Sequence, residues 1–331
     1  MSESLVQIGQ AVSPSSRGAR KGRPEWLRIK LVTSSSYHQV RNLVANLNLH
    51  TVCQEAHCPN IYECWGEHGT ATFMILGDIC TRRCGFCAVT SGRPQPGVDP
   101  LEPEHVAEAV ATMGLRHAVI TSVDRDDLPD GGAGHFARVI EAVRRRSARP
   151  LSGPTFPGGQ SPGCAVEVLT PDFRGVSEAL DVVLGAAPEV FSHNMETVPR
   201  LYRQARPGSR YDRSLGLLAA AAGAAAAGAY RGRLKTGIMV GLGEEPDEVL
   251  ATLADIRGAG VEILTIGQYL QPTAEHLPVA RWVHPDEFAA FREHALALGF
   301  AHCEAGPLVR SSYHAHEHVR PPAAATAKES G

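Results

Sequence analysis

The sequence predicts an α/β protein in which six consecutive β-α units form one parallel sheet. From Thr72 onward, short apolar runs of strand length alternate with longer segments of helical periodicity, the order typical of parallel sheets. The chain has 331 residues, of which 43% are hydrophobic and 20% are charged, so it can bury a sizeable core. Because an α/β barrel can contain this length as a single unit, the pattern decides the number of domains.

The expected strands are short apolar runs separated by helical patterns. We place them at residues 72–76, 117–121, 166–169, 190–194, 234–240 and 262–266. Two of the helices have recognisable starts, at Pro103 and Pro285, because proline is favoured in the first turn of a helix. The alanine-rich segment 215–229 is another strong helix former, since alanine loses no side-chain entropy there.

The chain divides into four expected segments. Residues 1–23 are rich in Ser, Gly and Arg, and we expect a disordered cytoplasmic tail. Residues 24–70 fit no β-α unit and are expected to cover the barrel, which spans residues 71–300. Residues 301–331 are expected to form a non-repeating C-terminal extension with a disordered end. Within the barrel, the Pro-, Gly- and Ser-rich residues 149–163 predict an irregular surface insertion.

Composition argues against several classes of protein. The net charge of -3 and the pI of 6.6 are unlike those of a surface built to neutralise phosphate, so we expect no nucleic-acid partner. No apolar run approaches the roughly 18 residues of a membrane span, and the N-terminus lacks a signal-peptide core. We therefore expect a cytoplasmic protein with no membrane partner. Eight cysteines in a large chain without export features indicate metal sites rather than disulfides.

Three cysteines, here called the loop triplet, directly follow the first expected strand. Cys80, Cys84 and Cys87 have C-x3-C-x2-C spacing, without a fourth cysteine at a matching distance. A structural zinc site is closed by four protein ligands, whereas a four-iron cluster held by three thiolates keeps one iron free for substrate. Gly85 lets the loop pass close to such a cluster, and Phe86 can shield it. A zinc knuckle is the alternative, although a barrel strand is an unusual context for one.

A second set of cysteines, the N-terminal triplet, lies upstream. Cys53, Cys58 and Cys64 have C-x4-C-x5-C spacing and also lack a fourth cysteine nearby. Another iron-sulfur cluster is the economical interpretation. The alternative is a zinc site completed by His57 or His68, since sites with three cysteines and one histidine are common. Measurement of bound iron separates the two.

These motifs resemble those of a known family. The loop triplet is similar to the signature of the radical S-adenosylmethionine (radical SAM) superfamily, and its pairing with the N-terminal triplet is similar to the lipoyl synthase family. Further stretches that resemble this family are PEWLR at 24–28, TSVDRDD at 121–127, EVLTPDF at 167–173, HNMETV at 193–198 and RSSYHA at 310–315. The resemblance implies a partial (β/α)6 barrel of the radical SAM type with N-terminal and C-terminal extensions.

The resemblance also implies the chemistry. In the superfamily, S-adenosylmethionine binds the open iron of a 4Fe-4S cluster and is cleaved by one electron to methionine and a 5'-deoxyadenosyl radical. In the lipoyl synthase family, radicals formed at C6 and C8 of an octanoyl-lysine take up sulfur from an auxiliary 4Fe-4S cluster, which is consumed, and two S-adenosylmethionine molecules are used per lipoyl group. An auxiliary cluster that only relays electrons and a zinc-stabilised binding module without catalysis are the competing hypotheses.

The resemblance assigns ligands to both clusters. The first cluster would be held by Cys80, Cys84 and Cys87, and the auxiliary cluster by Cys53, Cys58, Cys64 and the hydroxyl of Ser312. Serine is a harder and more weakly held iron ligand than thiolate, so this corner is where the cluster is expected to open. The alternative for Ser312 is a hydroxyl that caps local backbone.

Other polar residues and glycines follow the expected strands, at the end where β-α barrels carry their chemistry. We expect the cofactor to contact Ser122, Asp124, Asn194, Glu196, Gly241 and Gly243. The glycines resemble a superfamily motif whose backbone approaches the adenosyl moiety. The alternative for a polar residue is to cap the following helix.

The resemblance implies three kinds of partner. They are an octanoylated lipoyl-carrier domain, of the H protein or 2-oxoacid dehydrogenase E2 type, a reductant such as flavodoxin or ferredoxin, and a carrier that rebuilds the auxiliary cluster. Arg200, Arg203, Arg206 and Arg210 suggest a basic patch for an acidic carrier, although a solvated face is the more common role of such a charge run. Cys164 and Cys303 are expected to be inert buried thiols, and His314, His316 and His318 are expected to be free of metal.

Overall fold

The computed structural model describes residues 24–27, 35–47, 49–55, 58, 60–61, 64–65, 70–147, 163–313 and 315. Several expectations from the sequence lie outside these ranges. They concern the tail at 1–23, residues 149–162 of the expected insertion, the chain beyond 315, and His57, His68 and His314.

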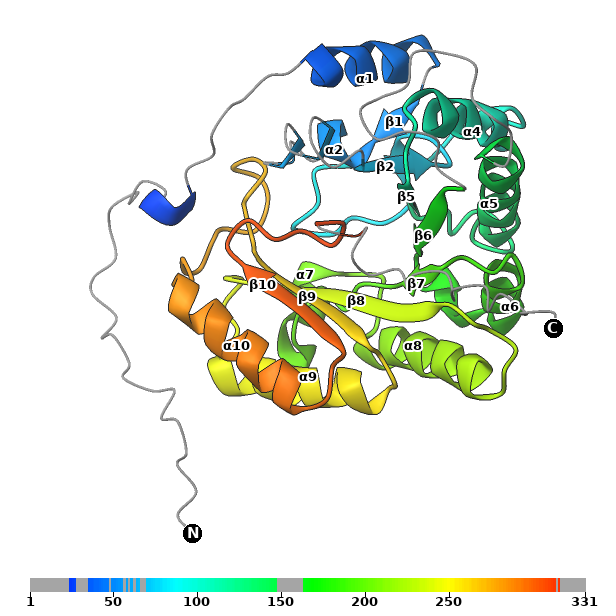
Figure 1. Cartoon of the computed structure of the whole chain (residues 1–331). Helices are drawn as coiled ribbons and strands as arrows, with labels where there is room; N and C mark the ends of the chain where they lie inside the picture. The colour runs from blue at the N-terminus through cyan, green and yellow to red at the C-terminus, as the bar shows by residue number, and fades with distance from the viewer. Residues whose placement is uncertain are drawn as a thin grey trace, which may run out of the picture.

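One curved sheet of eight strands forms the centre of the molecule (Figure 1). Its spatial order is β1 (His50–Thr51), β2 (Thr70–Ile75), β5 (His117–Ser122), β6 (Ala165–Leu169), β7 (Val190–Ser192), β8 (Arg233–Val240), β9 (Ile263–Gln268) and β10 (His302–Gly306). Neighbours from β2 to β10 are parallel, and β1 is antiparallel to β2. Because the edge strands β1 and β10 do not pair with each other within the described ranges, the barrel is partial.

Helices cover the outer face of this sheet (Figure 1). The longer helices are α1 (Ser35–Asn46), α4 (Glu102–Thr112), α5 (Ala133–Ser147), α6 (Ser177–Gly185), α8 (Tyr211–Ala226), α9 (Pro246–Gly258) and α10 (Pro285–Ala297). Short elements are α2 (Val52–Glu55), α7 (Tyr202–Ala205), the 3-10 turns Glu25–Leu27, Phe173–Gly175 and Pro199–Leu201, and a separate two-stranded pair, β3 (Ile79–Cys80) with β4 (Thr90–Ser91). In the described part of the chain, no helix is both long enough and apolar enough to span a membrane.

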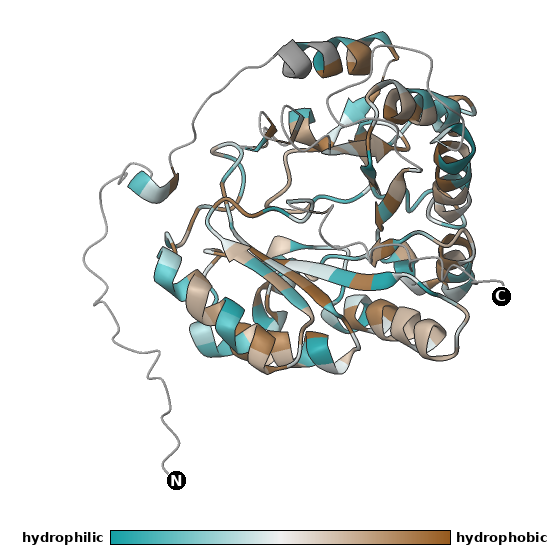
Figure 2. Cartoon of the chain, viewed as in Figure 1, coloured by the Kyte–Doolittle hydropathy of each residue, from teal (hydrophilic) through white to brown (hydrophobic). Residues whose placement is uncertain are grey.

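Strand side chains alternate between two environments, because successive residues of a strand point to opposite faces. On β8, Leu234 belongs to the apolar core, whereas Gly237 and Met239 line an interior cavity. Figure 2 shows the resulting mixture of hydrophobic and hydrophilic residues along the strands and the flanking helices. One face of the sheet therefore packs against the helices, and the other builds the interior.

A buried ionic group fills the interior below the cavity. Lys235 Nζ donates to Glu167 Oε1 at 2.7 Å, and His117 Nε2 lies 3.4 Å from Glu167 Oε2. All three side chains are almost completely buried. Two residues further along the same strands, Leu169 and Gly237 line the cavity, so the ionic group forms its floor. Burial lowers the pKa of Lys235, and the pairing with Glu167 opposes this shift.

The predicted fold class is confirmed, and all six expected strands are present with ends within two residues of the expected bounds. The α10 helix begins at Pro285, as expected. The strand β10 is additional: it extends the parallel sheet within a segment expected to be non-repeating. Its sequence, HCEAG, buries only Cys303, so hydrophobic alternation gave no signal for a strand.

Candidate functional site

A cavity of about 440 Å³ opens inside the partial barrel at the carboxyl ends of its strands. The residues that line it include Ser122 at the end of β5, Leu169 at the end of β6 and Gln268 at the end of β9. In β-α barrels, this is the end at which loops from several strands converge. The cavity therefore occupies the position expected of an active site.

The loop triplet lies on the wall of this cavity, which Cys80, Cys84 and Cys87 all line. The loop is fixed at Gly85, whose N–H donates to Ala205 O at 2.9 Å and whose carbonyl accepts from Leu277 N at 2.8 Å. A Cβ at Gly85 would lie 2.9 Å from Leu277 Cγ, so a larger residue would separate these segments. The three thiols are thus held in place by neighbours distant in sequence.

Burial keeps the free thiols of this loop protonated. It raises the pKa of Cys84 to about 12, an effect that the charge of Arg206 opposes, and it raises the pKa of Cys87 to about 11. A thiol must lose its proton to bind a metal. The positive charge needed to stabilise three thiolates here would therefore come mainly from the bound metal.

The N-terminal triplet meets the C-terminal segment across the same cavity. Cys53, Cys58 and Ser312 line it, whereas Cys64 does not. The side-chain amide of Asn60 donates to Leu308 O at 2.8 Å and so joins the two segments. Within the described ranges, no three His, Cys, Asp or Glu side chains converge closely enough to hold a single metal ion.

A glycine of β9 lets the C-terminal segment reach the cavity. A Cβ at Gly267 would lie only 2.3 Å from Val309 O. Arg310 is anchored beside it through a 3.4 Å hydrogen bond from NH1 to Gln268 O. Burial raises the pKa of Cys58, and the charge of Arg310 opposes this rise, so Arg310 lies within electrostatic reach of the N-terminal triplet.

Four of the expected cofactor-binding residues line the cavity: Ser122, Asp124, Asn194 and Glu196. Two of them have a buried oxygen without a partner in the described part of the chain, namely Ser122 Oγ and Asn194 Oδ1, whereas Asp124 Oδ1 lacks a hydrogen bond but lies 3.3 Å from Arg82 NH1. A buried polar atom left unpaired costs about 1–3 kcal/mol. Such atoms on a cavity wall are typical of a site whose ligand supplies the missing partners.

Gly241 and Gly243, by contrast, are not among the residues that line the cavity. Gly241 has a φ of 102°, and a Cβ there would lie 2.1 Å from Gln268 Nε2. Its N–H donates to Glu244 Oε1 at 2.5 Å. Gly241 therefore serves the turn after β8, and the cavity-facing glycine of that strand is Gly237.

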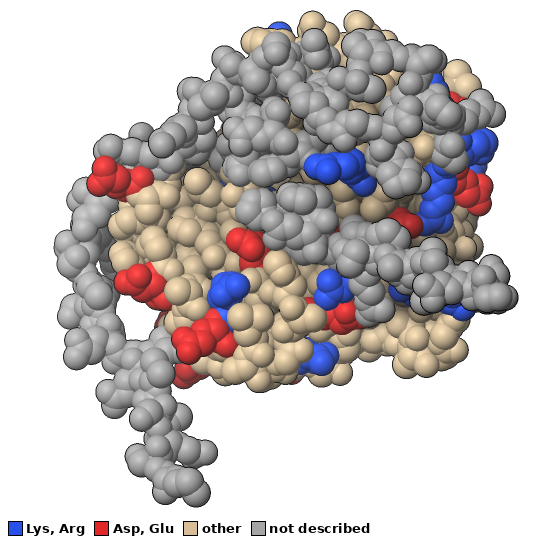
Figure 3. Space-filling model, viewed as in Figure 1, with Lys and Arg blue, Asp and Glu red and all other residues tan. Residues whose placement is uncertain are grey.

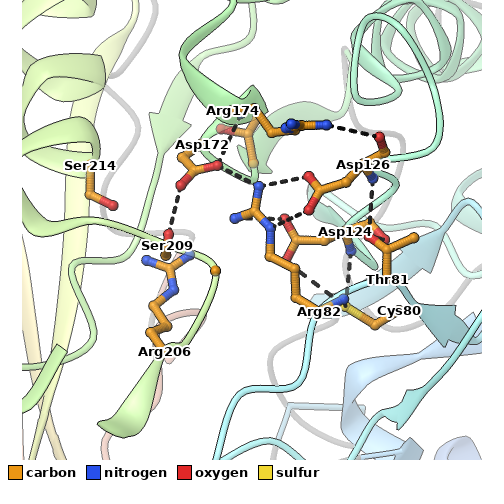
Figure 4. A network of polar contacts seen from close by, with 12 residues as sticks. Cys80, Thr81, Arg82, Asp124, Asp126, Asp172, Arg174, Arg206, Ser209 and Ser214 are labelled. Atoms are coloured by element: carbon orange, nitrogen blue, oxygen red, sulfur yellow. Dashed lines mark hydrogen bonds and ion pairs between the residues drawn. The ribbon is translucent and has the colours of Figure 1, made fainter. Parts of the chain in front are cut away.

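Arg82, within the loop triplet, is a site residue that the sequence did not single out. Its Nε and NH2 donate to Asp126 at 2.8 and 2.7 Å, and NH2 also donates to Asp172 Oδ1 at 2.7 Å (Figure 4). Its NH1 lies 3.3 Å from Asp124 Oδ1. Burial alone would raise the pKa of Asp172, but the hydrogen bond and charge of Arg82 hold it well below its usual range. The loop is therefore tied to the ends of β5 and β6.

Three of the four arginines that suggested a basic patch are either paired with acidic side chains or buried. Arg200 pairs with Glu248 at 2.7 Å, and Arg210 pairs with Asp212 at 2.5 Å. Arg206 is buried and lines the cavity. Where described residues are visible in Figure 3, acidic and basic side chains are interspersed.

The two remaining cysteines lie outside the site. Cys164 and Cys303 are buried, as expected, and do not line the cavity. Burial raises the pKa of each to about 12, so their thiols are protonated at neutral pH.

Comparisons with known proteins agree with this architecture. Residues 74–256 match the radical SAM superfamily, and residues 9–58 match the N-terminal domain of lipoyl synthases of that family. The chain is 54% identical to the lipoyl synthase of Rubrobacter xylanophilus over 304 residues, which cover 90% of this chain and 87% of the relative. It is 53% identical to the lipoyl synthase of Laribacter hongkongensis, with coverage of 90% and 89%.

A solved structure shows the same fold. Streptococcus suis SuiB bound to S-adenosylmethionine aligns with a TM-score of 0.51 at 10% identity, covering 77% of this chain and 56% of SuiB. At this level of identity, the likeness concerns the fold alone.

Proposed function

The chain belongs to the lipoyl synthase family of the radical SAM superfamily, and from this we propose which of its residues carry out the family's reaction. The enzyme is a radical SAM sulfurtransferase that inserts sulfur at C6 and C8 of a protein-bound octanoyl-lysine to form the lipoyl cofactor. It uses a 4Fe-4S cluster and S-adenosylmethionine.

We assign the ligands of this cluster to Cys80, Cys84 and Cys87. Three soft thiols on a cavity wall suit iron, and the three-ligand set leaves one corner for the cofactor. When bound, the cluster supplies the electron that cleaves S-adenosylmethionine and so generates the radical. The chain's own residues hold the loop in place. The contacts of Gly85 with Ala205 and Leu277 support this role.

Ser122, Asp124 and Asn194 are proposed to bind the polar groups of S-adenosylmethionine. Asp124 Oδ1 and Asn194 Oδ1 can only accept hydrogen bonds, and the cofactor has an amino group and hydroxyls that can donate. Ser122 Oγ can do either. Glu196 receives a hydrogen bond from Asn194, so we propose that it orients that amide. Gly237 replaces Gly241 and Gly243 as the proposed point of close backbone approach.

The auxiliary cluster is proposed to bind Cys53, Cys58, Cys64 and the hydroxyl of Ser312. The observation that carries this proposal is that Cys53, Cys58 and Ser312 line the same cavity as the loop triplet. A radical generated at one wall and a sulfur source at the other would then share one enclosure. The octanoyl chain would lie between them.

The remaining assignments concern surroundings and partners. We propose that residues 24–70 form the extension that covers the barrel and carries the auxiliary cluster, and that the chain after residue 300 supplies Ser312. The proposed partners are an octanoylated carrier domain of the H protein or E2 type, flavodoxin or ferredoxin as reductant, and an iron-sulfur carrier that rebuilds the auxiliary cluster. The proposed location is the cytoplasm.

The test combines metal analysis with two product assays. Anaerobically reconstituted protein should contain about eight iron and eight sulfide ions, four per cluster. Cys58→Ala should keep about four irons and still cleave S-adenosylmethionine, but it should not sulfurate an octanoyl-lysyl peptide. Cys84→Ala should lose cofactor cleavage as well. Cys164→Ala is the matched control, because that thiol is buried outside the cavity.

Three results would contradict these assignments. Full sulfuration by Cys58→Ala would exclude the N-terminal triplet as the sulfur site. Retention of all auxiliary iron through a turnover that yields product would favour an electron relay. A colourless, zinc-loaded protein after anaerobic purification would favour a binding module.

A further inference from the structure

A chain of buried hydrogen bonds runs behind the cavity wall and ends at Arg206. The NH1 of Arg206 donates to the hydroxyl of Tyr202 at 3.2 Å, and Tyr202 donates to Ser214 Oγ at 2.8 Å. Ser214 Oγ lies 2.9 Å from His193 Nε2, and His193 Nδ1 lies 2.8 Å from Thr170 O. The chain links the turn after α7 to the start of α8 and to the ends of β6 and β7. We call it the His193 chain.

Every proton in the His193 chain has a defined direction. A carbonyl can only accept, so His193 Nδ1 carries the proton shared with Thr170 O. Burial and the charge of Arg206 lower the pKa of His193 to about 3, so its Nε2 is an acceptor at neutral pH. Ser214 must then donate to His193 and accept from Tyr202, which in turn accepts from Arg206. Removing one hydroxyl would break the order of the whole chain.

The His193 chain holds the charged side chain of Arg206 in a buried position. Arg206 is 7% exposed, Tyr202 is 4% exposed, and Ser214 and His193 are fully buried. Although burial alone would lower the pKa of Arg206, the neighbouring Tyr202 and Glu196 hold it above its usual range. The guanidinium therefore remains positive where solvent cannot screen it.

Among the described residues, hydrogen bonds reach only one edge of this guanidinium. Its hydrogen bonds to Tyr202 and to Asn194 O, the latter at 2.8 Å, are both made by NH1. Nε and NH2 have no hydrogen-bond partner within the described part of the chain, and Arg206 lines the cavity. Two donors with a positive charge are thus left for an anionic group inside it.

The backbone of Arg206 is tied to the loop triplet as well. Ser209 N donates to Arg206 O at 3.0 Å, and Ser209 Oγ donates to Asp172 Oδ2 at 2.6 Å. Asp172 also accepts from Arg82 of the loop at 2.7 Å (Figure 4). Arg206 is therefore held in place relative to the thiols through its backbone carbonyl and through its side chain.

We propose that His193, Ser214 and Tyr202 are positioning residues: they hold Arg206 so that its Nε and NH2 face the anionic part of the ligand in the cavity. The proposal rests on the proposed function, since it takes S-adenosylmethionine as that ligand. None of the three residues needs to touch the ligand. Their effect passes through the orientation of one side chain.

The experiment measures binding rather than turnover. The full-length, cluster-loaded protein in its oxidised state is dialysed anaerobically against S-adenosylmethionine. Tyr202→Phe and Ser214→Ala should each raise the Kd about tenfold, the factor that corresponds to about 1.4 kcal/mol. The Kd of the double variant should lie within about twofold of the Kd of either single variant, because both changes break the same chain of hydrogen bonds. Iron content should be unchanged.

The matched control is Tyr211→Phe. Tyr211 lies edge-on to Tyr202 at 5.5 Å between ring centroids, and its hydroxyl donates to Asp255 Oδ2 at 2.8 Å. Tyr211 does not line the cavity, so the Kd of the Tyr211→Phe variant for S-adenosylmethionine should match that of the parent protein. A crystal structure of Tyr202→Phe gives an independent readout, in which the guanidinium of Arg206 should have turned.

Several outcomes would overturn the proposal. An unmoved Arg206 in the Tyr202→Phe crystal structure would do so even if no cofactor binds. Unchanged Kd values combined with a lower melting temperature would show a merely structural chain. If the fold increases in Kd of the two single variants multiplied in the double variant, Tyr202 and Ser214 would act independently. Failure of the parent protein to bind S-adenosylmethionine would instead refute the proposed function.

Discussion

Replacing Gly267 by alanine should remove the proposed auxiliary cluster while the cluster of the loop triplet stays active. The added Cβ would lie 2.3 Å from Val309 O and 3.2 Å from Val309 C, whereas ordinary contacts begin at 3.4 Å. The contact is to backbone, so no side-chain rotation can relieve it. The segment at Val309 must move away from β9 by at least about 1 Å, a form of overpacking that typically costs about 1–3 kcal/mol.

This displacement should be felt at Ser312, three residues after Val309. If Ser312 completes the auxiliary site, the Gly267→Ala variant should lose auxiliary iron and fall from about eight toward about four irons per chain. The loop triplet is anchored at Gly85 by Ala205 and Leu277 rather than by this segment, so reductive cleavage of S-adenosylmethionine should persist. Sulfuration of an octanoyl-lysyl peptide should fall with the auxiliary iron.

The assay compares iron content, 5'-deoxyadenosine and sulfurated peptide in the same preparation. Gly223→Ala on α8 is the control, because a Cβ there meets nothing within 4 Å. It should be stabilised by roughly 0.5–1 kcal/mol, the difference between glycine and alanine within a helix. A Gly267→Ala variant with eight irons and undiminished sulfuration would refute the placement of the C-terminal segment at the auxiliary site.

Three further predictions concern the cavity wall, its floor and its pH dependence. Gly237→Ala would place a Cβ 2.7 Å from Thr265 Oγ1 and 3.0 Å from Asn194 Oδ1, so it should weaken binding of S-adenosylmethionine in dialysis while iron content stays complete. Lys235→Met leaves the carboxylate of Glu167 buried without its cation and should lower the free energy of unfolding by about 3–5 kcal/mol in urea titrations, a loss that Glu167→Gln should partly restore. The pKa of His193 is lowered to about 3 in the folded protein, whereas an unfolded histidine titrates near 6.5. The unfolded chain binds more protons between these values, so stability should fall as pH drops below about 6.5, by at most about 1.4 kcal/mol per unit. His193→Gln should flatten this slope.

Each of these predictions can fail in a distinct way. Unchanged cofactor affinity in Gly237→Ala would remove Asn194 from the proposed binding site. Equal stability losses in Lys235→Met and in the double variant would show that the ion pair is not the cause. An identical pH slope with and without His193 would assign the acid sensitivity to other groups.

The strands of the barrel could be predicted because their apolar runs are buried against helices. The six expected strands carry residues such as Phe73, Ile120 and Val168 in the core, and this periodicity is legible in the sequence. The strand β10 was missed because hydrogen bonding to β9, rather than side-chain burial, defines it. Local pattern cannot reveal a strand that depends on a preformed edge.

The cysteine motifs could be recognised because ligands close in sequence leave a fixed spacing. Arg206 belongs to no motif of fixed spacing in the sequence. Its spacing from Arg203 and Arg210 resembled a helix face, but α7 ends at Ala205, and Arg206 adopts a φ of -135° that turns it toward the interior. The role of Arg82 depends on Asp172, 90 positions away, and such a pairing is set by the fold.

The hydrogen bond between Asn60 and Leu308 joins residues 248 positions apart, and it has a consequence for biogenesis. The proposed auxiliary ligands come from both sides of this bond, so the complete set does not exist on a nascent chain until β10 has been made and added to the sheet. A cluster offered earlier in synthesis would find only thiols, without the serine corner. The complete set of four proposed ligands would therefore form only after the C-terminal segment has folded against the barrel.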